Sequence, residues 1–518
     1  MTTLRAPGDG AGAGLPRLPV GIAGFDDLSM GGLSERRTTL VVGTAGSGKT
    51  VFAVQFLVEG IRRFGQPGVL VTIELTREDI AANVAGFGWD LHALESDGRL
   101  AVVDGSPAID DEVVAIGDFD FEGLIARIES VVRRVGAKRV AVDALGALLP
   151  LMTDPTMVRR ELRRLISAFR EMDVTTLLTV ERGEEYGAVT RFEVEDFVAD
   201  NVIVLRNPLE GEKRRRTIEL LKMSGCAHHK GEYPFTIEPR TGVNIIRYTA
   251  IELVRQAAAD RLSLGNAEFD AMCGGGLYRD SIVLVSGGTG TGKTVMATHF
   301  TQAALTRGER ALYISLEESP GQLIRTARAW GMDFEPPWTD GQLAIFAQYP
   351  ERMGLEDLLV ELRLEIERLR PTRIVIDSLT ALERTSSAKS FREFVVGLVN
   401  TLKTDRLAGM LTHTAPVVTP LESISETHVS TIADAIVLLR YVEIEGNLRR
   451  AALILKMRGS WHDTQIREYH IHDAGLAIDE PLRGMSGILG GTQLYSRYVG
   501  ASAEPPVPPV RGPREPDG

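Results

Sequence analysis

The sequence is poor in cysteine and has neither a long apolar run nor an excess of positive charge. Only Cys226 and Cys273 occur among 518 residues, which excludes a disulfide framework and predicts a reducing, cytoplasmic environment. A membrane-spanning helix needs about 18 or more apolar residues, and the best stretch, residues 140–152, is interrupted by Asp143. Residues 1–15 lack the apolar segment of a secretion signal and are expected to form a flexible leader.

The charge balance argues against nucleic acid as a default partner. Acidic residues outnumber basic ones by 70 to 58, so the net charge is −12, and the 44% hydrophobic and 25% charged content is typical of a soluble globular protein. Binding to DNA would require a local basic patch. The compact basic cluster of the sequence, residues 213–216, is also typical of a solvated strand edge.

The chain contains two copies of one module. The pattern RLxxGxxxFD followed by GGL occurs twice, at an offset of 244 residues, and later motifs repeat at an offset of 234. The matched segments are 17–33 with 261–277, GTAGSGKT at 43–50 with GGTGTGKT at 287–294, and RVAVDAL at 139–145 with RIVIDSL at 373–379. Each copy is long enough to fold as a domain, so we expect a tandem duplication.

Within each copy, short β-branched runs alternate with stretches of helical apolar spacing, which predicts an α/β fold with a largely parallel sheet flanked by helices. Ligands of such sheets bind at the carboxyl ends of the strands. The expected organisation is a leader (1–15), a first domain (16–247), a linker (248–260), a second domain (261–485) and a Pro-rich flexible tail (486–518).

Both copies carry the phosphate-binding pattern G-x-x-x-x-G-K-[ST], each between an apolar strand and a helix. Glycines let successive backbone N–H groups surround phosphate oxygens, the lysine neutralises charge, and the hydroxyl reaches Mg²⁺. A glycine-rich turn with an incidental lysine is the alternative, and two copies in register exclude it. The predicted ATP-binding residues are Gly46, Ser47, Gly48, Lys49 and Thr50, and Gly290, Thr291, Gly292, Lys293 and Thr294.

Carboxylates follow other strands of each copy. Asp143 and Asp377 each end an apolar strand, where a carboxylate can hold Mg²⁺ or its waters, although a turn or cap aspartate is the alternative. Glu74 and the pair Glu317 and Glu318 follow the second strand, where a glutamate can accept a proton from an attacking water or hydroxyl. A solvated strand end is the alternative for each glutamate.

A hydroxyl pair occurs only in the second copy. Ser430 and Thr431 stand in SETHVSTIAD, where the first copy has Asp196 and Phe197. From spacing alone, a serine-threonine pair before a helix or strand is usually a cap or turn.

Basic residues follow on a late strand of each copy, from Arg216 to Lys222 and from Arg450 to Lys456, with Arg458 beyond. They are candidates for reaching a neighbour's γ-phosphate, and a charged edge strand is an equal alternative.

These motifs together resemble the KaiC family of bacterial circadian-clock ATPases from about residue 16 to 485. The segments that carry the resemblance are FDAMCGGGLYRDSI, GTGTGKT, EESPGQL, YPERMGLEDLL, HVSTIADAIVLLRYVEI and KMRGSWHD. The resemblance implies two RecA-like P-loop NTPase domains in a double-ring homohexamer with ATP between subunits. It further implies an ATPase in the first ring and a serine/threonine autokinase and autophosphatase in the second.

The resemblance also implies roles for single residues. Ser430 and Thr431 fall on the paired phosphoacceptors, and Glu317 falls on the catalytic glutamate that also touches Mg²⁺, with Glu318 beside it. Glu74 is its counterpart in the first domain. The residues implied to contact ATP are Trp330, Lys222 and, across the interface, Arg450, Lys456, Met457 and Arg458.

Two departures from the family's pattern bear on activity and partners. The first domain has Glu74-Leu75 and Lys222-Met223-Ser224 where the family has two glutamates and Lys-x-Arg, so a slowed first-domain ATPase is expected. The tail differs from the extension that docks KaiA, which puts KaiA binding in doubt and leaves a KaiB-like partner on the first ring open.

Three functions are therefore compared. The preferred hypothesis is an ATP hydrolase and autokinase that uses Mg²⁺ and acts as a clock- or stress-type regulator. The alternatives are a RecA-like, DNA-stimulated motor or recombinase and an ATP-stabilised scaffold with little turnover.

Overall fold

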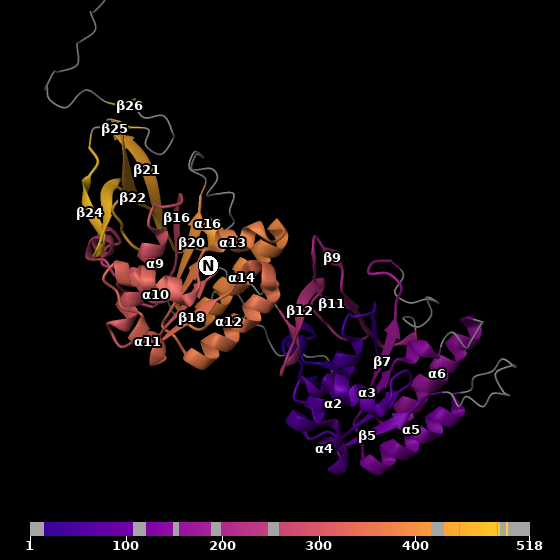
Figure 1. Cartoon of the computed structure of the whole chain (residues 1–518). Helices are drawn as coiled ribbons and strands as arrows, with labels where there is room; N and C mark the ends of the chain where they lie inside the picture. The colour runs from indigo at the N-terminus through magenta and orange to yellow at the C-terminus, as the bar shows by residue number, and fades with distance from the viewer. Residues whose placement is uncertain are drawn as a thin grey trace, which may run out of the picture. The chain divides into compact units, whose positions relative to one another are not determined.

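The computed structural model describes residues 15–106, 121–148, 155–187, 198–246, 258–415, 429–444 and 446–483, with two short strands at 485–486 and 494–495 (Figure 1). The chain divides into two compact units, with strands β1–β13 in the first and β14–β26 in the second. Most of the predicted leader, linker and tail lies outside the described residues, so the domain boundaries stay predictions. No described helix combines the length and the apolar character needed to cross a membrane.

The first unit is built on a nine-stranded sheet with the order β13-β12-β11-β8-β3-β7-β6-β4-β5. The six strands from β8 to β5 are parallel, and β11, β12 and β13 are antiparallel to their neighbours. The strands are β3 (Thr38–Gly43), β4 (Gly68–Thr72), β5 (Leu100–Asp104), β6 (Arg139–Asp143), β7 (Thr175–Glu181), β8 (Asn201–Arg206), β11 (Thr217–Met223), β12 (Glu232–Glu238) and β13 (Gly242–Ile245).

The second unit repeats this topology strand for strand. Given from the same side as the first sheet, its order is β24-β23-β22-β21-β16-β20-β19-β17-β18. Its strands are β16 (Ile282–Gly287), β17 (Ala311–Ser315), β18 (Leu343–Ala347), β19 (Arg373–Asp377), β20 (Ala408–Thr414), β21 (Ala435–Ile444), β22 (Asn447–Met457), β23 (Arg467–His472) and β24 (Gly475–Pro481). Two mostly parallel sheets with one shared order confirm the predicted tandem RecA-like fold.

Helices cover both faces of the first sheet (Figure 1). Because side chains alternate along a strand, Val41 of β3 packs with Phe52 of α2, whereas the adjacent Val42 packs with Ile128 of α5. The helices of the first unit are α2 (Lys49–Phe64), α3 (Arg77–Ala85), α4 (Leu91–Ser96), α5 (Glu122–Val135) and α6 (Pro155–Glu171). Those of the second are α9 (Lys293–Leu305), α10 (Pro320–Ala329), α11 (Glu335–Thr339), α13 (Leu379–Arg384), α14 (Ala388–Thr404) and α16 (Val429–Ile432). Helix α12 (Leu355–Leu369) is divided, because its residues up to Leu362 group with the first unit.

The repeated opening motif forms a small hairpin with a helix in each unit. Arg17 donates to the carbonyl of Gly32 at 2.9 Å, and Arg261 donates to that of Gly276 at 2.6 Å. These contacts explain why arginine and glycine recur at one spacing. The remaining short elements are β1 (Arg17–Leu18), α1 (Phe25–Leu28), β2 (Leu33–Ser34), β9 (Leu209–Glu210), β10 (Lys213–Arg214), β14 (Arg261–Leu262), α8 (Ala267–Met272), β15 (Leu277–Tyr278), β25 (Met485–Ser486) and β26 (Leu494–Tyr495), with 3₁₀ turns at Leu145–Ala147 and Pro350–Arg352.

In each unit, the strand whose last residue is the predicted metal-site aspartate begins with a buried arginine. Arg139 is 0% exposed, donates to the carbonyls of Pro19 at 2.6 Å and Phe56 at 2.9 Å, and stacks on the Phe56 ring. Arg373 makes the corresponding contacts with the carbonyl and ring of Phe300. Burial lowers the pKa of Arg139 to about 10. These guanidinium groups join the strand to the helix that follows the phosphate loop.

Candidate nucleotide site

Each phosphate-binding loop ends at a glycine that no other residue could replace without strain. Gly48 and Gly292 have φ values of 95° and 92°, in the left-handed region, and they cap α2 and α9. An added Cβ would lie 2.6 Å from Ile237 Cδ1 in the first unit and 2.7 Å from Ile471 Cδ1 in the second. The loop therefore keeps the shape that directs the free N–H groups of the helix N-terminus at an anion.

The lysine that follows each of these glycines is held against its own loop. Lys49 Nζ donates to the carbonyls of Gly43 at 3.0 Å and Thr44 at 2.9 Å. Lys293 Nζ makes the same two contacts, with the carbonyl of Gly287 at 3.1 Å and that of the next residue at 2.9 Å. Burial lowers the pKa of both lysines, and nearby carboxylates partly oppose that shift. A buried ammonium group at this place can neutralise phosphate charge.

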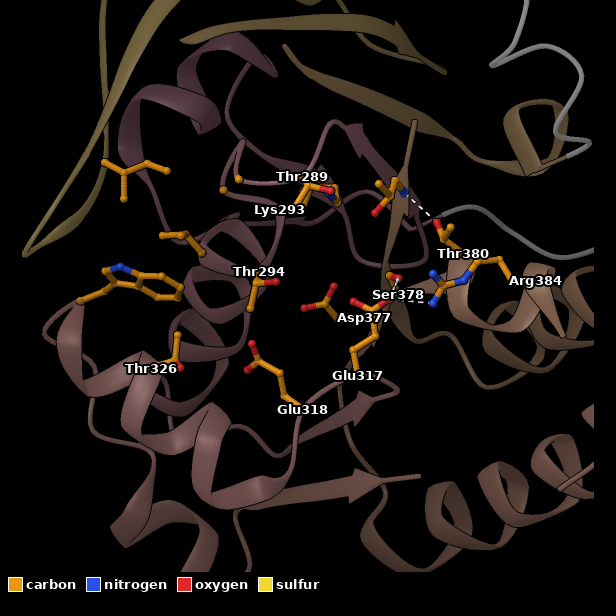
Figure 2. Close-up of a pocket in the computed structure, with 16 residues that line it drawn as sticks. Thr289, Lys293, Thr294, Glu317, Glu318, Thr326, Asp377, Ser378, Thr380 and Arg384 are labelled. Atoms are coloured by element: carbon orange, nitrogen blue, oxygen red, sulfur yellow. Dashed lines mark hydrogen bonds and ion pairs between the residues drawn. The ribbon is translucent and has the colours of Figure 1, made fainter. Parts of the chain in front are cut away.

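A cleft of about 470 Å³ opens beside the loop of the second unit. Figure 2 shows Thr294, Glu317, Glu318 and Asp377 around one open space, reached from α9, from the end of β17 and from the end of β19. The lining residues are Thr289, Gly290, Gly292, Lys293, Thr294, Val295, Glu317, Glu318, Thr326, Trp330, Asp377, Ser378, Thr380, Arg384, Thr414 and Ile471. The structure thus brings together the sequence-predicted loop, carboxylates and Trp330 of this unit.

The carboxylates in the cleft have few protein partners. Glu318 Oε2 is buried with no hydrogen-bond partner among the described residues. Burial, followed by the charges of Asp377 and Glu317, raises the pKa of Glu318. Glu317 accepts a hydrogen bond from Ser378 at 3.4 Å and lies 3.8 Å from Arg384. Such a concentration of negative charge is a suitable environment for a hard cation.

Mg²⁺ fits this donor set. It is commonly held by one or two carboxylates together with hydroxyl groups, water and substrate phosphates. The described residues contain no group of three or more His, Cys, Asp or Glu side chains that could enclose a metal ion alone. Thr294, Asp377 and Glu317 would therefore hold Mg²⁺ only together with a nucleotide.

The two aspartates differ in one of their hydrogen-bond donors. In the first unit, Thr50 Oγ1 donates to Asp143 at 2.8 Å. In the second unit, the fully buried Tyr313 donates its hydroxyl to Asp377 at 2.9 Å. The residue at the Tyr313 position of the first unit is Leu70, which cannot donate. Thr179 and Thr412 donate to Oδ1 of the two aspartates alike, so only the donor to Oδ2 differs: the loop threonine in one unit and a buried tyrosine in the other.

Arg450 and its counterpart lie at their own phosphate loops. Arg450 Nε lies 3.4 Å from the carbonyl of Gly290, which also accepts a hydrogen bond from Tyr441 at 2.7 Å. In the first unit, Arg216 Nε lies 3.3 Å from the carbonyl of Gly46. Arg216 belongs to the basic cluster considered for DNA binding, so part of that cluster supports the nucleotide loop instead. Glu74, the acid expected in the first unit, is exposed after β4.

The expected phosphoacceptors lie on the short helix α16. Ser430 is half-buried and Thr431 is exposed. Lys456 Nζ donates to the carbonyl of Ser430 at 2.9 Å, and Arg458 donates to that of Thr431 at 2.7 Å. Burial, followed by the charge of Arg458, lowers the pKa of Lys456. Two cations thus fix the backbone of the acceptor segment.

Helix α16 and the phosphate loop lie at opposite edges of the sheet. Helix α16 leads into Ala435, which pairs with Val283 near the start of β16, whereas the loop follows the other end of that strand. The five steps from the first to the last residue of β16 span about 16 Å at 3.3 Å per step. Neither Ser430 nor Thr431 is among the residues that line the cleft.

The expected group of Arg450, Lys456, Met457 and Arg458 is therefore divided. Met457 pairs with Ala435 and lies with Lys456 and Arg458 at the α16 edge, whereas Arg450 lies at the loop edge. In the first unit, Lys222 lies at the corresponding edge of the sheet, where β8 begins, and donates to the carbonyl of Ala199 at 2.9 Å.

Sequence reasoning missed Tyr313, Tyr441 and Arg384. The repeat offered one signal, because aligning the two copies sets Tyr313 against Leu70 inside otherwise similar apolar strands. Nothing in the spacing indicated Arg384, which lies on α13 and contacts Glu317 only in the folded unit.

Comparisons with known proteins agree with this site. A family model described as the KaiC ATPase matches residues 18–250 and 263–483. The circadian clock protein KaiC3 of Synechocystis sp. is 49% identical over 483 residues, covering 93% of this chain and 95% of that protein. The circadian clock oscillator proteins KaiC of Thermostichus vulcanus and Synechococcus elongatus are 47% and 46% identical, with 94% and 91% of this chain and 93% and 90% of those proteins covered.

Proposed function

Because the chain belongs to the KaiC family of ATPases, we propose that its first unit hydrolyses ATP and its second unit phosphorylates Ser430 and Thr431 of a neighbouring copy. The observation that carries the second part is the separation of about 16 Å between the cleft edge and the acceptor edge of one sheet. A hydroxyl at one edge cannot reach a phosphate at the other, so the acceptor must come from another chain.

The residues of the second cleft take these roles in the proposal. Lys293 neutralises the phosphates of ATP, and Mg²⁺, when bound, screens the charge that develops on the transferred phosphoryl group. The oxygen of Thr431 or Ser430 bonds to the γ-phosphorus while the bond from phosphorus to the ADP oxygen breaks. Glu317 accepts the hydroxyl proton. In the autophosphatase activity the same step runs in reverse: an ADP oxygen bonds to the phosphorus as the bond to the Ser430 or Thr431 oxygen breaks, and that oxygen regains its proton.

Further parts of the proposal concern assembly and partners. ATP would lie between subunits of a homohexamer, with Lys456 and Arg458 of one copy close to the nucleotide of the next. Both cations already hold the acceptor segment, so they would present its hydroxyls while stabilising negative charge. We place the protein in the cytoplasm as a clock- or stress-type regulator with a KaiB-like partner on the first ring and without KaiA.

The test mixes two full-length variants. One carries Lys293→Ala, which disables the donor cleft but keeps the acceptors, and the other carries Ser430→Ala with Thr431→Ala. After incubation with Mg²⁺ and labelled ATP, phosphate should appear on the Lys293→Ala chain only in the mixture, at Ser430 and Thr431 by mass spectrometry. Glu317→Gln should remove the label from homogeneous protein.

Other outcomes reject the proposal. Label at other residues, or none in unmodified protein, removes the kinase function. Absence of label from the Lys293→Ala chain in the mixture, when unmodified protein is labelled, contradicts transfer between chains. ATP hydrolysis that rises several-fold with single-stranded DNA would favour a DNA-dependent motor instead.

A further inference from the structure

Two tyrosines hold consecutive carbonyl groups of the phosphate loop in the second unit. Tyr441, on β21, donates to the carbonyl of Gly290 at 2.7 Å, and Tyr469, on β23, donates to the carbonyl of Thr291. Tyr469 is fully buried, and burial raises the pKa of its hydroxyl, which therefore keeps its proton at neutral pH. The last peptide group before the glycine that caps α9 thus has a permanent donor on its carbonyl side.

This contact determines where the N–H of the same peptide group points. The peptide bond between Thr291 and Gly292 is trans, so its C=O and N–H point in opposite directions. With the carbonyl directed at Tyr469, the N–H is directed away from that residue. Gly292 lines the cleft, and its N–H donates to no residue that the structure describes. An N–H at this position of a phosphate loop is a donor for a phosphate oxygen.

The same strand also packs against the glycine itself. Ile471 lies two residues after Tyr469, so the two side chains share a face of β23. Ile471 lines the cleft, and its Cδ1 lies 2.7 Å from the place that a Cβ on Gly292 would occupy. Strand β23 therefore fixes the end of the loop at two adjoining points, one polar and one apolar.

The first unit has the apolar point without the polar one. Phe235 is the counterpart of Tyr469, because its N–H donates to the carbonyl of Arg216, as Tyr469 pairs with Arg450. A Cβ added to Gly48 would lie 3.9 Å from Phe235 Cε2, so the ring faces the same part of the loop. A phenylalanine has no hydroxyl to donate.

Other contacts of the two loops differ in the same sense. Thr291 Oγ1 donates to the carbonyl of Gly288 at 2.8 Å, whereas Ser47 Oγ, its counterpart, is buried with no partner among the described residues. Asn207 takes the place of Tyr441 in the first unit, with its Nδ2 3.4 Å from the carbonyl of Gly46. The end of the loop is therefore held by more hydrogen bonds in the second unit.

We propose that Tyr469 is a positioning residue for nucleotide binding by the second unit. Its hydroxyl holds the peptide group between Thr291 and Gly292 with the N–H directed into the cleft before the nucleotide arrives. Binding then requires less ordering of the loop, which increases affinity. This inference rests on the proposed binding of ATP by the second unit.

The experiment uses the full-length chain with Lys49→Ala, so that binding of a fluorescent ADP analogue reports on the second unit. In this parent, Tyr469→Phe should raise the Kd about tenfold, the effect of one lost hydrogen bond. The variant is expected to fold, since Phe235 occupies the corresponding place in the first unit. The matched control, Thr301→Val, removes another buried hydroxyl that donates to a backbone carbonyl, at 2.9 Å within α9, and should leave the Kd within about twofold.

Competition against the analogue shows whether the effect comes through the phosphate loop. Unlabelled ADP should lose affinity for the Tyr469→Phe protein by the same factor of about ten. Adenosine has no phosphate for the loop to bind, so its inhibition constant should stay within about twofold of the parental value.

The remaining outcomes contradict the proposal. A Tyr469→Phe protein that is less stable in urea but keeps the parental Kd would make Tyr469 a core residue only. Equal losses for ADP and adenosine, or an equal loss in Thr301→Val, would show a general disturbance and overturn the proposal too. A parent that binds no analogue contradicts the proposed nucleotide binding by the second unit and is recognised before any Tyr469 variant is made.

Discussion

Replacing Tyr313 with phenylalanine tests how the second unit holds its metal-site aspartate. The substitution keeps the buried ring and removes only the hydroxyl that donates to Asp377 at 2.9 Å. No cavity forms, so the cost is that of one hydrogen bond to a charged group, about 2 kcal/mol in free energy of unfolding. Asp377 keeps its other hydrogen bond, from Thr412.

Urea denaturation followed by tryptophan fluorescence measures this loss. Three of the four tryptophans, Trp330, Trp338 and Trp461, lie in the second unit, so the signal reports mainly on that unit. The matched control is Tyr278→Phe. Its hydroxyl donates to the carbonyl of Gly459 on the exposed side and accepts from Arg261, whose guanidinium keeps three other acceptors, so the loss should cost about 1 kcal/mol or less. Equal losses for the two variants, or no loss for Tyr313→Phe, would refute the reasoning.

Three further predictions concern charge, a buried cation and the loop. Glu318→Gln should stabilise the protein at pH 7 by at most about 1 kcal/mol, since the side chain is half exposed. The raised pKa of Glu318 means that its stability contribution falls as pH rises above 4.5, so urea denaturation at pH 4 should show no gain. Arg139→Met should cost about 3 kcal/mol or more in the same assay, because several buried carbonyls lose their donor, whereas exposed Arg134→Met should cost little. Gly292→Ala should weaken nucleotide binding by the second unit at least about tenfold, whereas Gly308→Ala, where an added Cβ meets nothing, should not, as titration with a fluorescent ADP analogue would show.

The fold and the nucleotide loop could be predicted from the sequence because both depend on local signals. Apolar strands, a glycine-rich loop and a helix follow each other within short segments, and the repeat supplied a second copy of each. The positions of the aspartates that end β6 and β19 were predicted for the same reason, since parallel strands end at one edge of the sheet.

The placement of the late basic residues was not predictable, because it depends on strand length and register. Strand β22 runs from Asn447 to Met457, and the six residue steps from Arg450 to Lys456 cover about 20 Å. Neighbours in the sequence therefore reach opposite edges of the sheet. The hydroxyl of Tyr313 was missed for a different reason, since inside an apolar strand a tyrosine resembles any other core residue until its partner is known.

The opposite positions of cleft and acceptor helix restrict the symmetry of any assembly that uses both. Two copies related by a twofold axis present the same surface to each other, so a donor edge would meet a donor edge. Donor must instead face acceptor, which is a head-to-tail contact, and head-to-tail contacts either close into a ring or continue as a filament. A chain that phosphorylates its neighbour in this way is phosphorylated by a different neighbour.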